Sequence, residues 1–154
     1  MEQRVTARAV VYVDRPPEQV FAYVADVSRH AQWSPKPFRV GDLPPTGELV
    51  VGSTFTSYGH LPGRSEHRNE VRVLELEPSE RLVLESVDAS GTYRSTFVVA
   101  PRGGGSTVLR ELDLPRPDGV LGVTMPLFIR SVLGRDMSRG LRNLSTQLGS
   151  RPRE

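Results

Sequence analysis

The sequence contains no cysteine, one tryptophan and one lysine among its 154 residues. The absence of cysteine excludes a disulfide framework and catalysis by a thiol. Because Lys36 is the only lysine, nearly all of the positive charge is carried by arginine, and the formal net charge is only +2. A nucleic-acid-binding surface needs a dense basic face with interleaved aromatic residues. Here the arginines between Arg130 and Arg142 lie opposite the apolar residues of an expected helix, as on a solvated helix face, so we expect no nucleic-acid partner.

Long apolar runs are also missing. The longest uncharged apolar stretch, residues 119–129, is much shorter than the roughly 20 residues that a membrane-spanning helix needs. Met1 to Arg4 lead directly into a strand-like segment and not into the apolar core of a signal peptide. We therefore expect a cytoplasmic protein without an integral membrane segment.

What is present is the composition of an ordinary globular chain, with 37% hydrophobic and 25% charged residues. A chain of this length is long enough to bury a core as one domain. No repeat, low-complexity segment or linker divides it. We expect one domain over residues 1–149, followed by a frayed tail over residues 150–154.

The last third of the chain has the periodicity of one long amphipathic helix, from Thr124 to Leu148. Apolar residues recur mostly three or four positions apart, which places them on one side of a helix. Gly134 and Gly140 each cost about 1 kcal/mol relative to alanine, so packing must hold this helix. Thr124 suits the N-cap. The apolar residues of the expected buried side are Met125, Phe128, Ile129, Val132, Met137, Leu141, Leu144 and Leu148.

Most of the remaining chain alternates between polar and apolar residues, as half-buried strands do. A first strand over residues 5–14 precedes two short helices, one opening at Pro16-Pro17 and one near residues 28–32. Strands are then expected at residues 38–43, 53–60, 66–76, 81–88, 92–100 and 106–114. Turn residues about every dozen positions are typical of an antiparallel meander.

These elements predict an α+β fold. A curved antiparallel sheet of about six or seven strands would grip the long C-terminal helix on its concave side, with two short helices after the first strand. A sheet that grips a helix only part-way leaves a cavity, which is a common site for a small apolar ligand.

Four stretches of the chain resemble the START-like superfamily with the helix-grip fold, specifically its bacterial polyketide cyclase/dehydrase and lipid-transport branch. They are residues 13–21 with 25–27 and 32–33, residues 51–55, residues 73–82, and residues 104–107 with 141–144. Together they span nearly the whole chain. These stretches mark turns and packing positions, so the resemblance is specific for the fold. It says little about the function, because the ligands of this family vary widely.

Arg110 is the first candidate for chemistry. Strand parity places it on one face with Val108 and Leu112, so we expect a guanidinium among apolar side chains. Such a group does not deprotonate and needs a partner. One interpretation is that Arg110 orients a carbonyl or carboxylate of a ligand. The alternative is that it pairs with an internal carboxylate such as Glu70, or that it reaches solvent at a strand end.

The three histidines, His30, His60 and His67, share no metal-ligand spacing, and no cysteine supplements them, so we expect no metal site. His60 or His67 would suit a general base at the entrance of a cavity, since imidazole titrates near neutral pH. A structural role is the alternative for each of them. No nucleotide-binding or hydrolase motif occurs, and no cofactor is expected.

Large or polar side chains on the expected inner face define a candidate pocket, although each of them alone would serve equally well as core. The predicted ligand-binding residues are Trp33, Phe55, Tyr58, Tyr93, Ser95, Phe97, Arg110, Met125, Phe128 and Val132. Met125 to Phe128, with Gly119 and Gly122 just before them, would suit a mobile lip at the cavity.

Three functions follow as hypotheses. The first is binding, with transport as one role, of a hydrophobic small molecule such as a lipid or a polyketide. The second, which the resemblance implies, is a polyketide aromatase/cyclase or dehydratase, with Arg110, Tyr93 and His67 as candidate catalytic residues. The third is a protein-interaction or toxin-like stress module with an exposed apolar patch. The sequence leaves open whether the chain forms a homodimer.

Overall fold

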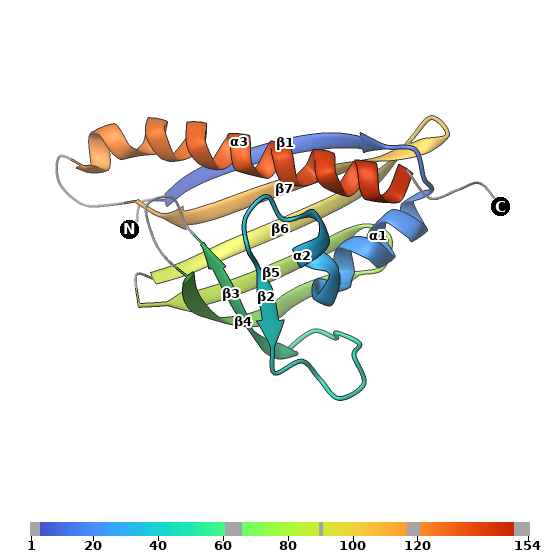
Figure 1. Ribbon diagram of the computed structural model, residues 1–154, viewed down its shortest axis with the longest axis horizontal. Coiled ribbons are helices and arrows are strands. Elements are labelled where there is room, and N and C mark those ends of the chain that lie inside the picture. The colour runs from blue at the N-terminus through green and yellow to red at the C-terminus, as the bar shows by residue number, and fades with distance from the viewer. Residues whose placement is uncertain (1–3, 61–65, 90, 117–120, 150–154) are drawn as a thin grey trace.

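The computed structural model describes residues 4–60, 66–89, 91–116 and 121–149, with no side-chain description at 121–125 and 129. It confirms the predicted helix-grip fold (Figure 1). The helices are α1 (Pro17–Ala25), the single-turn η1 (Val27–Arg29), α2 (His30–Trp33) and α3 (Leu121–Gly149). The strands are β1 (Arg4–Val13), β2 (Arg39–Gly41), β3 (Thr54–His60), β4 (Glu66–Glu77), β5 (Arg81–Asp88), β6 (Gly91–Arg102) and β7 (Gly105–Pro115).

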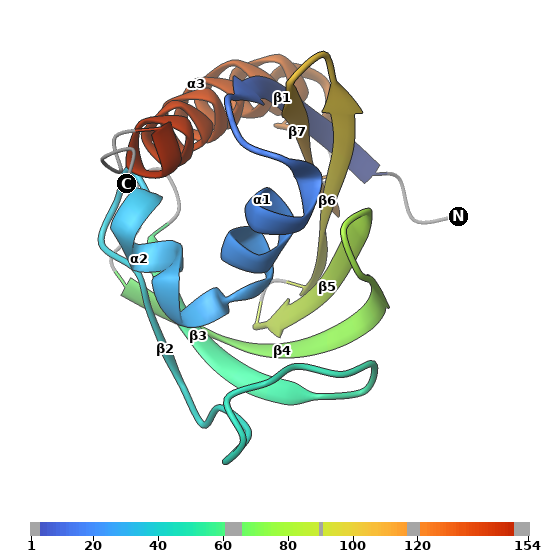
Figure 2. The same cartoon turned by 90° about the vertical axis from the view of Figure 1, so that its right-hand side faces the viewer.

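All seven strands form one antiparallel sheet in the order β1-β7-β6-β5-β4-β3-β2. The strands from β2 to β7 follow one another as a meander, and β1 joins it beside β7. A register shift in β4 between Val73 and Glu75 marks a bulge, a feature that bends a strand and increases its twist. Figure 2 shows the result, in which the sheet curls around α1 while α2 and α3 lie over its open side.

The interior is apolar and continuous. It joins alternate residues of the strands, such as Val73, Phe97 and Val108, to the buried side of α1. Val20 and Val24 on α1 lie four positions apart and are completely buried, as the amphipathic spacing predicts. Pro17 opens α1 at a position where its missing N–H leaves no helical bond unmade.

Helix α3 differs in two ways from the expected helix. It begins at Leu121, so Thr124 lies inside the helix and is not its N-cap. Its buried side is also rotated at the N-terminal end, because Leu133 is buried while Phe128 is 56% exposed. Phe128 lies nine residues before Met137, and at about 100° per residue that separation puts the two on opposite sides. Past Met137 the expected side is the observed one, with Leu141, Leu144 and Leu148 buried.

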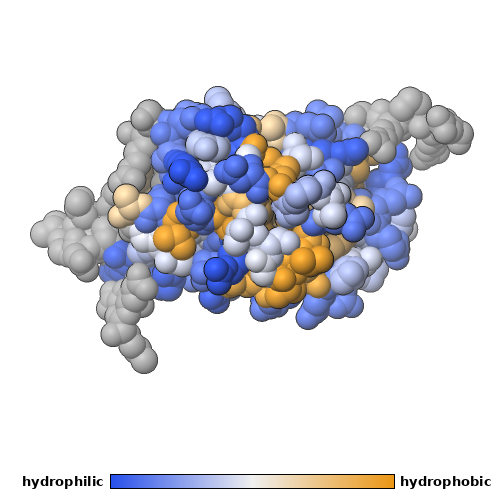
Figure 3. Space-filling model, turned by 90° about the horizontal axis from the view of Figure 1, so that it is seen from below, coloured by the Kyte–Doolittle hydropathy of each residue, from blue (hydrophilic) through white to orange (hydrophobic). Residues whose placement is uncertain are grey.

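Apolar side chains also reach the surface. Figure 3 shows apolar residues across the middle of the face seen from below, between polar neighbours. The exposed large apolar residues that the structure describes are Val10, Tyr12, Val50, Val51, Val87, Leu127 and Phe128. Among the described residues, no helix is both long enough and apolar enough to cross a membrane. The expected tail at residues 150–154 and the glycines of the expected lip, Gly119 and Gly122, lie outside the residues or side chains described.

Candidate functional site

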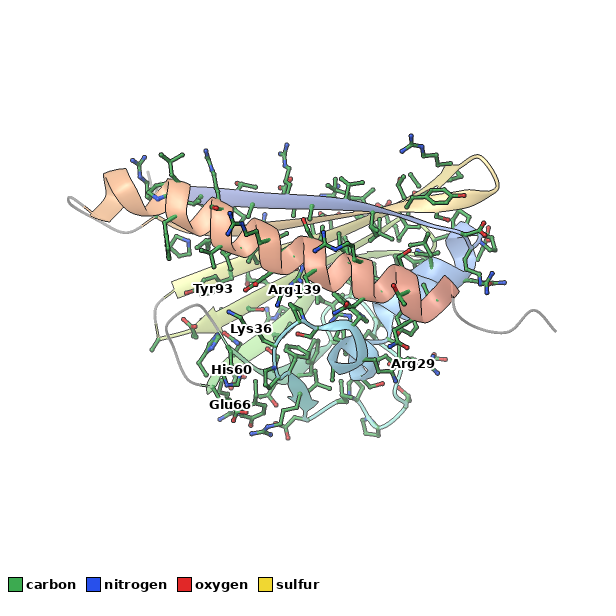
Figure 4. All side chains as sticks on the ribbon, turned by 45° about the horizontal axis from the view of Figure 1, so that its top comes forward. Arg29, Lys36, His60, Glu66, Tyr93 and Arg139 are labelled. Atoms are coloured by element: carbon green, nitrogen blue, oxygen red, sulfur yellow. The ribbon has the colours of Figure 1, made fainter. Side chains whose placement is uncertain are left out.

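A cavity of about 210 Å³ lies between the concave face of the sheet, the segment 34–38 and helix α3. The segment 34–38 follows α2, where Pro35 and Pro37 prevent the helix from continuing. Figure 4 shows Lys36, His60 and Tyr93, which all line the cavity, at the same end of the molecule, away from Arg29. The lining residues are Ser34, Pro35, Lys36, Pro37, Phe38, Ser57, Gly59, His60, His67, Asn69, Ser86, Tyr93, Ser95, Arg110, Leu112, Leu133, Asp136 and Met137.

Arg110 lines this cavity from β7 and points inward, as strand parity predicts. Burial lowers the pKa of its guanidinium to about 10, so Arg110 remains a cation at neutral pH. Its Nε atom is sealed from solvent and has no hydrogen-bond partner among the described residues. Glu70, the suggested partner, is instead largely exposed and forms an ion pair with Arg68 at 3.2 Å. No carboxylate in the described part of the chain pairs with Arg110.

Two aromatic rings that do not line the cavity lie near the guanidinium of Arg110. The guanidinium carbon is 5.3 Å from the ring centroid of Phe97 and 5.9 Å from that of Trp33, and these two rings meet edge to face. His30 packs against both rings, and its Nε2 lies 2.7 Å from the carbonyl oxygen of Val24. Burial lowers the pKa of His30 from 6.5 to about 4, and the nearby Arg110 acts in the same direction. His30 is therefore a neutral member of the core.

The other two histidines both line the cavity. His60 Nδ1 lies 3.1 Å from the carbonyl oxygen of Pro37, which fixes a proton on Nδ1 and leaves Nε2 as the acceptor of the neutral ring. His67 Nε2 is 3.8 Å from a carboxylate oxygen of Asp88, whose side chain is only 7% exposed, while His67 Nδ1 is buried without a partner in the described part of the chain. At 3.8 Å Asp88 is a nearby negative charge and not a hydrogen-bond partner of His67.

One ion pair links two lining elements. Lys36 Nζ, on the segment 34–38, lies 3.0 Å from a carboxylate oxygen of Asp136 on α3. Both side chains are partly exposed, so the pair holds the two elements together at the outer end of the cavity and contributes little to stability.

The structure separates the predicted ligand-binding residues into groups. Tyr93, Ser95 and Arg110 line the cavity. Trp33, Phe55 and Phe97 are buried in the core and do not line it.

Tyr58 alternates with the lining residues Ser57 and Gly59 and therefore projects from the opposite face of β3. There Arg39 stacks on its ring, with the guanidinium carbon 3.5 Å from the centroid.

Helix α3 faces the cavity with residues other than those expected. Leu133, Asp136 and Met137 line it, whereas Val132 and the exposed Phe128 do not. The cause is the rotation of the buried side described above. The side chain of Met125 lies outside the described residues.

Several lining residues were missed by the sequence reasoning. Asn69 and Ser86 lie at inward positions of their strands, and strand parity, which applies to polar residues as it does to aromatic ones, is the signal that identifies them. Ser57 is another of this kind. The segment 34–38 is not a strand and shows no such alternation. Its position depends on contacts with α3, which is distant from it in the sequence.

Metal binding would require several ligating side chains close together. No group of three or more histidine, aspartate or glutamate side chains that could hold a metal ion occurs in the part of the chain that the structure describes.

Comparison with known proteins identifies the family. The family model described as "Polyketide cyclase / dehydrase and lipid transport" matches residues 4–149, and the chain belongs to this family. A comparison with curated proteins finds no match. The family membership confirms the resemblance found in the sequence.

Solved structures share the fold. Protein CV1439 from Chromobacterium violaceum is similar with a TM-score of 0.73 at 20% identity, over 96% of this chain and 99% of that one. TTHA0849 from Thermus thermophilus gives 0.70 at 18% identity, over 93% and 96%. The di-domain ARO/CYC BexL from the BE-7585A biosynthetic pathway gives 0.73 at 15% identity, over 97% of this chain and 51% of that one. At these identities the likeness concerns the fold alone.

Proposed function

We propose that this protein binds a hydrophobic small molecule, such as a lipid fragment or a polyketide-like aromatic compound, in the cavity between the sheet and α3. The observation that carries this proposal is the cavity itself, which is about 210 Å³ in volume and lies in the concave face of the sheet. An apolar cavity of about 150 Å³ suffices to bind benzene. Apolar walls with a few convergent polar groups are typical of small-molecule sites.

Calorimetric titration tests this proposal directly. The probes are 2-naphthoate, an aromatic acid; 2-naphthamide, its neutral analogue; and laurate, a fatty acid. We expect one-to-one binding of at least one of them. Leu133→Phe, which adds volume inside the cavity, should remove that binding. Leu127→Phe is the matched control on the exposed side of α3 and should retain it.

Two results would contradict the proposal. One is that none of the three probes binds. The other is unchanged binding to Leu133→Phe, because a ligand in the cavity must compete with the larger side chain.

A second candidate function is an aromatase/cyclase or dehydratase that acts on a poly-β-ketone. It is favoured by the polar groups that converge on the cavity, namely the cation Arg110, the Tyr93 side chain and His67 beside Asp88. Arg110 would polarise a carbonyl, and a histidine would move a proton. This function predicts that Arg110→Ala abolishes turnover of a poly-β-ketone while the fold survives, and unchanged turnover would exclude that role.

A further inference from the structure

A line of polar side chains crosses the concave face of the sheet, and the binding of an apolar ligand does not by itself explain it. Each of five neighbouring strands contributes one inward-facing member, and all five line the cavity. We call this line the polar seam. Its members are Ser57 on β3, Asn69 on β4, Ser86 on β5, Ser95 on β6 and Arg110 on β7.

The strand register makes the polar seam a regular diagonal. Ser57 and Asn69 are direct partners across β3 and β4. Ser86 lies opposite Val71, which is the next inward position of β4 after Asn69. The same step of one inward position recurs between β5 and β6 and again between β6 and β7. The seam therefore runs continuously across the cavity wall and ends at the guanidinium of Arg110.

Among the described residues, the cavity holds one cation without a counterion. Lys36 is neutralised by Asp136 at 3.0 Å, and His67 has Asp88 nearby. His60 faces only a backbone carbonyl oxygen. Arg110 has no carboxylate partner in the same set of residues, and it stays protonated at neutral pH.

Two seam atoms also lack hydrogen-bond partners within the described ranges. Ser95 Oγ and Arg110 Nε are both buried and unsatisfied. Arg110 as a whole is half-buried, and a cation that is partly removed from water without an anion destabilises the folded protein. The orphaned, buried hydroxyl of Ser95 adds to that cost. Such a combination is stable as part of a binding site whose ligand supplies the missing charge and oxygen atoms.

We propose that the occupant of the cavity is a small organic acid with one or two rings and a further oxygen substituent. Its carboxylate lies on Arg110 and its other oxygen lies along the polar seam. This inference rests on the proposed function and narrows it, because it excludes neutral lipids as the preferred ligand. The volume of about 210 Å³ accommodates one or two rings but not a diacyl lipid.

The test compares matched ligands that differ only in charge. Calorimetric titrations are run with 2-naphthoate and 2-naphthamide on the wild-type protein, on Arg110→Met and on Arg139→Met. Methionine keeps the unbranched stem of arginine without its charge. Arg139 is an arginine of α3 outside the cavity lining, so it provides the control.

We expect the wild type and Arg139→Met to bind the acid at least tenfold more tightly than the amide, since a charge-assisted bond is the strong kind. Arg110→Met should bind both ligands with similar affinity, and retained amide binding shows that it is folded. Equal binding of acid and amide by the wild type would overturn this inference while the proposed function stands. A preference for the acid that survives in Arg110→Met would overturn it as well. If neither probe nor laurate binds, the proposed function itself fails, and this inference fails with it.

A third ligand tests the polar seam separately. The compound 6-hydroxy-2-naphthoate adds one oxygen at the end away from the carboxylate. It should bind the wild type about threefold or more tighter than 2-naphthoate, as one added hydrogen bond permits. Asn69→Leu, at the far part of the seam from Arg110, should remove this gain and retain the preference for the acid. A hydroxyl that gives no gain in the wild type, or the same gain in Asn69→Leu, would overturn the assignment of the seam.

Discussion

The guanidinium carbon of Arg110 lies 5.9 Å from the ring centroid of Trp33, the only tryptophan of the chain. Cations near aromatic faces are stabilised by roughly 0.5–2 kcal/mol. Full desolvation of a guanidinium without a counterion costs several kcal/mol. Arg110 is half-buried and its Nε is sealed from solvent, so it bears a large part of that cost. In the ligand-free protein Arg110 is therefore kept at the expense of stability, and the relationship between these two residues leads to the first prediction.

Replacing Arg110 with methionine should stabilise the ligand-free protein. The substitution removes an uncompensated, half-buried charge and keeps an apolar stem near Trp33 and Phe97. We expect the free energy of unfolding to rise by about 1–3 kcal/mol, measured by urea denaturation at pH 7. Arg139→Met, outside the cavity lining on α3, should change it by less than about 0.5 kcal/mol. A loss of stability in Arg110→Met would show that the cation has a partner that stabilises it.

His30 should make stability depend on pH. Burial lowers its pKa from 6.5 to about 4 in the folded protein, so between these values the unfolded chain binds a proton that the folded chain does not. Stability contributed by the neutral ring is therefore complete above pH 6.5 and is lost as the pH falls toward 4. The loss is on the order of 3 kcal/mol.

Comparison with His30→Phe isolates this contribution from that of the carboxylates, which titrate in the same range. Urea denaturation of both proteins at a series of pH values from 7 to 4 is the measurement. The stability of His30→Phe should fall less steeply than that of the wild type. Parallel pH profiles would show that His30 is protonated equally easily in the folded and unfolded chains.

Ligand binding should protect the only lysine from chemical modification. Lys36 lines the cavity at its outer end and is paired with Asp136, but its side chain remains 36% exposed. A bound ligand would reduce the access of an amine-reactive reagent to Lys36. We expect severalfold slower acetylation at this residue with saturating 2-naphthoate, followed by mass spectrometry. Free lysine added to the same reaction supplies the control, and equal slowing of its acetylation would rule out local protection of Lys36.

Two glycines of α3 should respond differently to alanine. A side chain at Gly134 would meet nothing within 4 Å, so Gly134→Ala should raise the free energy of unfolding by roughly 0.5–1 kcal/mol through helix propensity. A Cβ at Gly140 would lie 3.3 Å from Pro35 Cδ and 3.6 Å from the Trp33 ring.

Gly140→Ala should therefore gain less than Gly134→Ala, or destabilise the protein, because the segment 34–38 would have to move. Thermal or urea denaturation of the two variants side by side decides this. An equal rise in the free energy of unfolding for both variants would contradict this prediction. It would mean that the segment 34–38 moves away from residue 140 without destabilising the protein.

Much of the fold follows from short-range patterns. The alternation of residues in the strands predicts the meander, and it places Arg110 on the inner face because the period of two persists through β7. Its inward position beside apolar side chains is therefore readable from the sequence. The absence of a carboxylate partner among the described residues is not readable, because the partner would come from a distant strand.

The parts that could not be predicted depend on helix rotation and on long-range packing. The apolar residues expected on one side from Phe128 to Met137 include a step of five, from Val132 to Met137. Nine residues at about 100° each put Phe128 and Met137 on opposite sides, so Phe128 is exposed and Leu133 lines the cavity instead. The prolines at 35 and 37 predict that α2 ends, but contacts with α3 decide where the segment 34–38 then lies. The cavity is bounded by both of these features, so its volume and lining required the structure.

The measurement that tests the central claim most directly is native mass spectrometry of the protein as purified, followed by denaturation and extraction of any bound compound. We predict a complex with one small molecule per chain, and the extracted compound should be a ring acid with additional oxygen. A protein that is recovered empty, and stays empty after incubation with aromatic acids and lipids, would contradict the claim that this cavity is a ligand-binding site.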